Sequence, residues 1–284
     1  MFERISRSWG LVKASYAVLK ADRELIIFPL LSMLGVIIVT ITFIVPMALL
    51  DLINTTEGQE GLTPLGYVVT FLFYVVMYTI IIFANSALVG TALIRLRGGD
   101  PTVRDGFNIA MQHISQIIGF AIISATVGMI LRAISERGGI IGQIAASLVG
   151  FAWNVATFLV IPILVNEDIG PIEAIKRSGS MIKKTWGEQI AGDLSIGLIF
   201  FFITLGALLI GIPLAILAAS LGAAALVVVI ALLVIVVIGI NLVGSTLSGI
   251  YRAALYQYAI DGAESNVTNY FDEAMIHGAF RVKA

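Results

Sequence analysis

Six uninterrupted apolar blocks constrain the fold of this chain more than any other feature of its sequence. Each block is long enough to cross about 30 Å of hydrocarbon, which takes roughly 20 helical residues. The blocks run over 26–50, 64–95, 114–134, 139–165, 189–211 and 213–258. Hydrophobic residues make up 59% of the chain and charged residues only 12%, which is far from the average of soluble proteins. The sequence therefore predicts an integral membrane protein.

The continuity of the blocks indicates helices and excludes the strands of a membrane barrel, which alternate apolar and polar residues over about ten positions. Backbone amides in hydrocarbon then need the hydrogen bonds of a helix. We expect an all-α protein with six transmembrane helices in a single polytopic membrane domain over 1–284. An amphipathic segment over 1–24 precedes the spans, and a tail over 259–284 follows them. The boundary between spans five and six depends on the break "GIPLAILAASLG".

The basic residues divide unevenly between the two sides that six spans define. Fifteen of the 17 Lys and Arg residues fall on the side of the termini, and only Arg132 and Arg137 fall on the other. Basic loops stay in the cytoplasm, so we expect a multi-pass protein of the cell membrane with both termini in the cytoplasm. The expected partners are membrane lipids and a membrane-protein partner or a second copy of the chain, with no nucleic acid.

The segment "GPIEAIKRSGSMIKKTW" over 170–186 places four basic residues between two apolar blocks. Its apolar residues are spaced by three and four positions, as on one face of a helix: Ile172, Ile175, Gly179, Ile182 and Trp186. The basic residues fall elsewhere, which predicts an amphipathic helix at the membrane interface. The candidate contacts with anionic lipid are Lys176, Arg177, Lys183 and Lys184.

Two other segments resemble this one and indicate an internal repeat. At an offset of 70, "DPTVRDGFNIAMQHISQ" aligns Pro101 with Pro171 and has its own stripe at Val103, Phe107, Ala110, Ile114 and Ile117. At an offset of 170, "RISRSWGLVKASY" aligns Ile5 with Ile175 within a stripe of Phe2, Ile5, Trp9, Val12, Tyr16 and Leu19. We interpret the chain as three parallel hairpin repeats with amphipathic interfacial helices on the cytoplasmic side. The alternative is that any cytoplasmic loop of such a protein is basic and amphipathic.

Polar residues inside the spans form the second candidate site. Asn85 lies 16 positions before Pro101, and Asn154 lies 17 positions before Pro171. The full candidate cluster is Asn85, Ser86, Asn154, Thr157, Asn241, Ser245, Thr246 and Ser248. These residues either line a polar pocket in the membrane or hold helices together, at about 0.6 kcal/mol per hydrogen bond. Gly142, Ala146 and Gly150, spaced by four, indicate close helix packing rather than a site.

Signals of catalysis are weak. The chain has no cysteine, and neither His113 nor His277 belongs to a metal-binding motif. No Asp, Glu, Lys or Arg lies in the middle of a span, which speaks against a proton-coupled transporter. We expect a protein that is not an enzyme, with no catalytic residue, metal or cofactor.

The opening "FERISRSWGLVKASYAVLKADRELIIFPLLS" and the closing "YRAALYQYAIDG" and "YFDEAMIHGAFRVK" resemble a family of uncharacterised prokaryotic six-span membrane proteins. The resemblance implies no reaction or cofactor. Residues 171–186 are more weakly similar to the membrane domain of some glycerophosphodiester phosphodiesterases, although the chain has no attached catalytic domain. The function that we expect is a non-enzymatic scaffold or accessory subunit that engages lipid or partner proteins. The alternative is a permease or lipid-handling protein with a polar intramembrane pocket.

Overall fold

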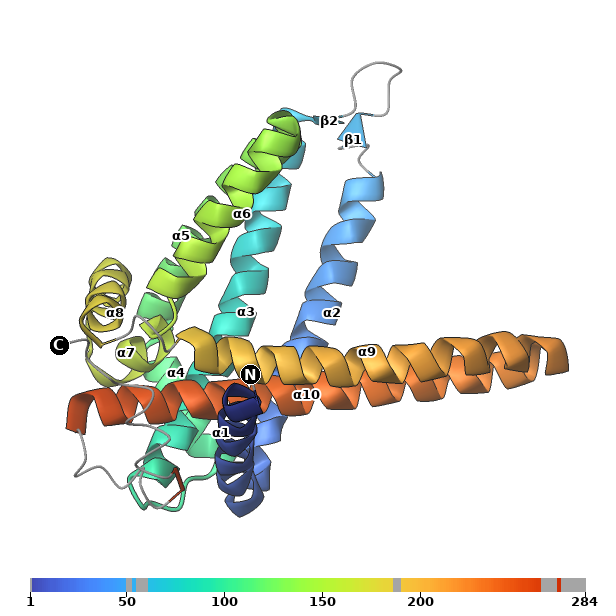
Figure 1. Cartoon of the computed structure of the whole chain (residues 1–284). Coiled ribbons are helices and arrows are strands. Elements are labelled where there is room, and N and C mark those ends of the chain that lie inside the picture. Colours follow the sequence, from blue (N-terminus) through green and yellow to red (C-terminus); the bar gives the residue numbers. More distant parts are fainter. Residues whose placement is uncertain (1, 50–52, 55–60, 186–189, 262–269, 272–284) are drawn as a thin grey trace. The chain divides into compact units, whose positions relative to one another are not determined.

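The computed structural model describes residues 2–49, 53–54, 61–185, 190–261 and 270–271, and nearly all of them are helical (Figure 1). Six helical segments are long and apolar enough to cross a membrane, which confirms the predicted number. They cover Arg23–Leu49, Pro64–Leu96, Ile114–Arg137, Gly139–Asn166, Ile196–Leu221 and Ala223–Asp261. A pair of two-residue strands, β1 (Ile53–Asn54) and β2 (Gly61–Leu62), adds a small antiparallel ladder between the first two.

The chain divides into two compact units, whereas the sequence analysis treats it as one domain. The α9–α10 unit comprises Met1–Ile26, Ala92–Asp100 and Thr185–Ala284. It holds α1 (Phe2–Ala21), η1 (Arg23–Ile26), α9 (Ile190–Leu221) and α10 (Ala223–Asp261). The α2–α8 unit comprises Ile27–Thr91 and Pro101–Lys184. It holds α2 (Ile27–Leu49), most of α3 (Pro64–Leu96), α4 (Val103–Gln112), α5 (Ile114–Arg137), α6 (Gly139–Ala156), α7 (Val160–Asn166) and α8 (Pro171–Thr185).

In the α9–α10 unit, a single residue connects two long antiparallel helices. Gly222 has φ +116°, a conformation that side chains disfavour, and it separates Leu221 from Ala223. The predicted boundary at 211–213 is therefore wrong, and α9 continues through Pro213 to Leu221. A proline is tolerated inside a membrane helix because neighbouring groups and local adjustments satisfy the freed backbone carbonyl.

In the α2–α8 unit, small residues allow the long helices to approach closely. A Cβ atom at Gly142 would lie 2.4 Å from the Ile134 carbonyl oxygen, so only glycine fits between α5 and α6. Ala146 is also buried and Gly150 is half-buried, in agreement with the predicted close packing. The fourth span has an interruption that the sequence analysis did not predict, at 157–159, where α6 ends and α7 follows.

Three further helices, α1, α4 and α8, precede the long hairpins, and each predicted stripe is partly buried and partly exposed: Val12, Leu19, Ala110 and Ile182 are buried. The face of α8 that is buried consists of Ala174, Ser178, Met181 and Ile182, whereas Ile172 is exposed. Trp9 and Tyr16 on α1 are likewise exposed, as is Phe107 on α4. On α4 and α8 part of the buried face consists of small residues, Gly106 and Ala110 or Ala174 and Ser178, which allow close helix contacts. Trp186 and the side chains of Phe2 and Ile5 lie outside the described residues.

Candidate functional site

The outward face of α8 carries the predicted basic residues. Lys176, Arg177 and Lys183 are exposed, while the side chain of Lys184 lies outside the described part of the chain. The Arg177 guanidinium lies 3.2 Å from a carboxylate oxygen of Glu167 and so has an acidic neighbour. Beneath the helix, the buried Ser178 hydroxyl accepts a hydrogen bond of 3.1 Å from the Leu159 backbone N–H. This bond satisfies one backbone donor at the interruption before α7 and fixes which face of α8 points outward.

The helices α1 and α4 combine basic and large apolar side chains on their outward faces in the same way. Lys13 and Lys20 are exposed on α1, and Arg104 is exposed on α4. A reciprocal capping box starts α4, in which the Thr102 hydroxyl donates to the Asp105 carboxylate at 2.7 Å and accepts from the Asp105 N–H at 3.3 Å. The hydroxyl bond, the Thr102 backbone N–H and nearby Arg104 lower the pKa of Asp105.

The predicted polar cluster falls into both units, with Asn85, Ser86, Asn154 and Thr157 in the α2–α8 unit. The Asn85 amide donates to the Ile81 carbonyl at 2.9 Å, and the Thr157 hydroxyl donates to the Trp153 carbonyl at 2.8 Å. Both acceptors belong to the preceding turn of the same helix. Asn154 is exposed, whereas Ser86 is buried and its hydroxyl has no hydrogen-bond partner among the described residues.

The other four members lie on α10. Asn241 donates to the Val237 carbonyl at 2.8 Å, and both Ser245 and Thr246 donate to the Leu242 carbonyl, at 3.0 and 2.7 Å. Thr246 is buried, Ser248 is half-buried, and Asn241 and Ser245 are exposed. Five of the eight side chains therefore bond a backbone carbonyl of their own helix, as isolated polar residues in membrane helices commonly do.

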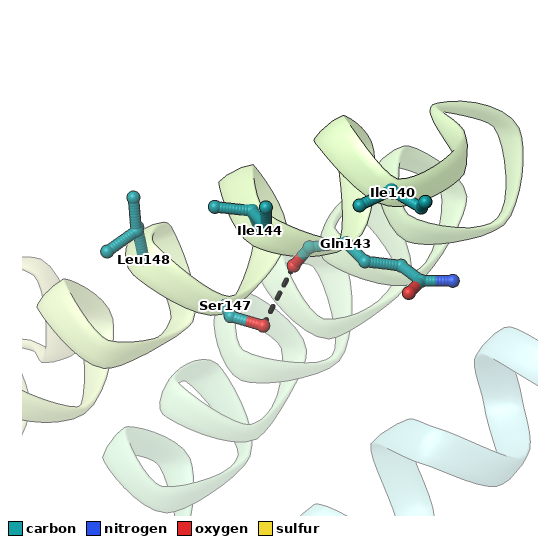
Figure 2. Close-up of a pocket in the computed structure, with 5 residues that line it drawn as sticks. All are labelled: Ile140, Gln143, Ile144, Ser147 and Leu148. Atoms are coloured by element: carbon teal, nitrogen blue, oxygen red, sulfur yellow. Dashed lines mark hydrogen bonds between the residues drawn. The ribbon is translucent and has the colours of Figure 1, made fainter.

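The outward face of α6 carries two polar residues that the sequence analysis did not select. Gln143 and Ser147 line a surface hollow of about 370 Å³ together with Ile140, Ile144 and Leu148. Figure 2 shows that the Ser147 hydroxyl donates to the Gln143 carbonyl, at 2.8 Å. All five lining residues come from one helix, so this hollow is an open groove. The sequence pattern that could have indicated this polar face is the spacing of Gln143, Ser147 and Asn154 by four and seven positions, which places them on one side of the helix.

A second cavity, of about 290 Å³, lies between three helices of the α2–α8 unit. Its walls are nearly all apolar, and we call it the α2–α3–α4 groove. Its lining residues are Phe28, Leu31 and Ser32 from α2, Thr79, Ile80, Phe83, Ala84 and Ala87 from α3, and Phe107 from α4. Sequence patterns did not predict this groove because they do not say which helices are neighbours.

A polar network in the α9–α10 unit was also missed. The Arg95 guanidinium, at the end of α3, donates to both carboxylate oxygens of Asp22 and to Asp100 at 2.5 Å. Nearby in the sequence, Arg97 donates to Gln257 on α10 at 2.9 Å, and Gln257 donates to Asp261. Among the described residues, no group of three or more His, Asp or Glu side chains is arranged to hold a metal ion.

The six long apolar helices have the length and composition of a multi-pass membrane protein. Comparison with known families is more specific: the chain belongs to the family of unknown function DUF6159, whose model matches residues 64–266. The match includes the closing "YRAALYQYAIDG" and leaves out the opening segment and the tail on which the expected resemblance also depended. No curated protein matches the chain significantly, and the similarity to phosphodiesterase membrane domains finds no support.

Proposed function

We propose that this protein is a non-enzymatic membrane scaffold or accessory subunit that engages anionic lipid through α1, α4 and α8. The observation that supports this function is common to the three helices. Each one buries a face of small or aliphatic side chains and exposes basic residues, and each exposes a large apolar residue as well. Such a surface suits the boundary between headgroups and hydrocarbon.

The same helices support the proposed three-fold repeat, although in a different register. The first residues of α4 and α8 are Val103 and Pro171, which lie 68 positions apart rather than 70. The buried small residues Gly106 and Ala110 on α4 have the same 68-residue spacing from Ala174 and Ser178 on α8.

For α1 and α8, an offset of 163 matches better than the predicted 170. It pairs the buried hydroxyls of Ser15 and Ser178, and it pairs the exposed Lys13 with Lys176 and Lys20 with Lys183. In this proposal the three helices lie at the cytoplasmic surface of the cell membrane, with both termini on that side, because the excess of basic residues lies there.

Electrostatic attraction gives the expected strength of this interaction. A Lys or Arg near an anionic membrane surface contributes about 1 kcal/mol, or about fivefold in affinity. Lys176 and Lys183 are the strongest candidates on α8 for contact with anionic lipid, because Arg177 already forms an ion pair with Glu167. We expect the effects of several such residues to combine across the three helices.

The alternative function, a permease with a polar pathway, has less support. Five of the eight candidate side chains already donate to carbonyls of their own helix, which leaves few donors for a solute. Replacement of Asn85 and Asn154 by leucine tests the two roles. Loss of solute flux with normal folding would favour the permease, whereas a parallel loss of folding would favour helix packing.

The lipid function can be tested with the protein in vesicles that contain spin-labelled phosphatidylglycerol or spin-labelled phosphatidylcholine. The double variant Lys176→Gln/Lys183→Gln is expected to lose the preference for phosphatidylglycerol several-fold. Arg137→Gln, on the other side of the predicted membrane topology, is the matched control and is expected to keep that preference. The proposal would be abandoned if the wild-type protein showed no preference, or if the control lost as much of it as the double variant.

A further inference from the structure

Two close glycine contacts involve residues that line the α2–α3–α4 groove. A Cβ atom on Gly106 of α4 would lie 2.5 Å from the Phe28 ring and 2.9 Å from the Ala87 carbonyl oxygen. A Cβ atom on Gly35 of α2 would lie 2.8 Å from the Ile80 side chain. From Phe28 to Gly35 the α2 helix rises roughly 10 Å. The groove is therefore a short slot beside close helix contacts.

The chemistry of the walls selects an apolar occupant. Phe107 of α4 contacts aromatic rings from both other helices of the wall. Its ring centroid lies 5.8 Å from that of Phe28 on α2 and 5.9 Å from that of Phe83 on α3. Ser32 and Thr79 contribute the two hydroxyls of the wall, and that of Thr79 donates to the Val75 carbonyl at 2.7 Å. A water molecule needs two to four polar partners to be held in a cavity. These walls offer too few, so a hydrocarbon chain suits the space better than water or a polar solute.

The position of the groove indicates where that hydrocarbon comes from. Phe28 is at the start of α2, so the groove lies toward one end of the apolar spans rather than at their centre. Leu31 and Phe107 on its margin are 40% and 37% exposed, which leaves the groove accessible from the outer surface of the helices. In a membrane, that surface is covered by lipid chains. An acyl chain can therefore enter from the side while its headgroup remains at the interface.

A basic side chain lies on the same helix as the aromatic margin. Arg104 precedes Phe107 by three positions on α4, so the two are neighbours along one side of the helix. Arg104 is exposed. The guanidinium is a good partner for a phosphate because it presents several donors in a fixed plane. A lipid with its chain in the groove would therefore have its phosphate close to a complementary charge.

We propose that the α2–α3–α4 groove binds part of one acyl chain of an anionic glycerophospholipid from the surrounding bilayer, with Arg104 as the phosphate contact. This defined site for a single lipid rests on the function proposed for α1, α4 and α8 and shares Arg104 on α4 with it. The groove requires neither Lys176 nor Lys183, so loss of lipid retention in the groove and loss of lipid preference at α8 are distinguishable.

A substitution that fills the groove provides the first test. Ala84 lines the cavity and is 8% exposed, so Ala84→Phe places a ring in the space of the chain. Ala145→Phe, at an exposed position of α6, is the matched control. The proteins are reconstituted with phosphatidylglycerol, extracted into mild detergent and analysed by native mass spectrometry. We expect one retained phospholipid per wild-type and Ala145→Phe chain and at least a fivefold loss in Ala84→Phe.

Two further variants keep the test decisive if Ala84→Phe does not fold. Leu31→Trp blocks the exposed margin of the groove without changing a buried position, and it is expected to lower lipid retention to a similar degree. Arg104→Gln is expected to retain the lipid but to lose the preference for phosphatidylglycerol over phosphatidylcholine about fivefold. Absence of retained lipid from the wild-type protein, or equal retention by Ala84→Phe and Ala145→Phe, overturns the proposal. So does cross-linking of a photoreactive residue at Phe107 to another polypeptide instead of to lipid.

Discussion

The ion pair between Asp22 and Arg95 should contribute much more to stability than the neighbouring pair between Arg95 and Asp100. All three residues belong to the α9–α10 unit. The side chains of Asp22 and Arg95 are only 10% and 18% exposed, whereas that of Asp100 is 94% exposed. The perturbation is Asp22→Asn, which keeps the shape of the side chain but turns an amide group toward a guanidinium that can only donate.

The expected magnitude follows from this difference in exposure. Removal of one partner from a buried ion pair costs about 3–5 kcal/mol because the other charge stays buried. Arg95 keeps Asp100 as a second partner, so we expect Asp22→Asn to cost about 3 kcal/mol, at the lower end of that range. An exposed pair is worth less than about 1 kcal/mol, which is the upper bound for Asp100→Asn.

The measurement is the free energy of unfolding in mixed micelles as the fraction of denaturing detergent rises. A double-mutant cycle with Arg95→Gln isolates the pairwise term, for which we expect a coupling energy above about 1 kcal/mol between positions 22 and 95. The reasoning would be refuted if Asp100→Asn destabilised the protein as much as Asp22→Asn. A coupling energy near zero would refute it as well.

Two other predictions concern the surface helices. Because the Thr102 hydroxyl is the largest cause of the lowered pKa of Asp105, Thr102→Val should raise that pKa toward its ordinary value. Capping by the ionised Asp105 is complete above the ordinary carboxyl pKa of about 3.9 and is lost as the pH falls through the lowered value. A carboxyl NMR titration in both proteins checks the direction, and an unchanged pKa would contradict it. Ser178→Ala should cost about 1–3 kcal/mol by leaving the buried Leu159 N–H without its acceptor; the same unfolding assay measures this loss, with exposed Ser180→Ala as the near-neutral control.

The sequence predicted the number and approximate extent of the membrane helices well, because a long apolar run has few alternatives in a bilayer. The boundary between spans five and six was placed at 211–213, at the start of the break "GIPLAILAASLG", whereas α9 continues to Leu221. A membrane helix can accommodate a proline, and the glycine at 222 makes the turn. The signal was present in the quoted break, whose last residue is that glycine.

The orientation of the surface helices was less predictable. The apolar stripes were expected at the membrane interface, and the structure buries only part of each: Val12 and Ile182 are buried, whereas Trp9 and Ile172 are exposed. In membrane proteins apolarity does not distinguish the protein interior from lipid, so size and close approach decide which face is covered. On α4 and α8, a search for small residues spaced by four would have found part of the buried face, at Gly106 and Ala110 and at Ala174 and Ser178.

The groove and the buried ion pair could not be predicted because both depend on contacts between distant segments. Asp22 and Arg95 are 73 positions apart, and no periodicity relates a residue before the first span to one at the end of the second. The groove similarly requires knowing that α4 contacts Phe28 and Ala87 through Gly106. The predicted polar cluster stays a prediction, because its members lie in two units, and five of the eight side chains bond a carbonyl of their own helix.

The turn at Gly222 has a consequence for biogenesis. Helices α9 and α10 are 32 and 39 residues long and have extensive contact with each other, yet no hydrophilic loop separates them (Figure 1). Because no polar segment separates the two helices, we expect them to enter the bilayer together as one helical hairpin. A nascent chain stalled after Leu221 would contain α9 without α10. An epitope tag inserted at Gly222 would separate the two helices, so we expect them to insert one after the other.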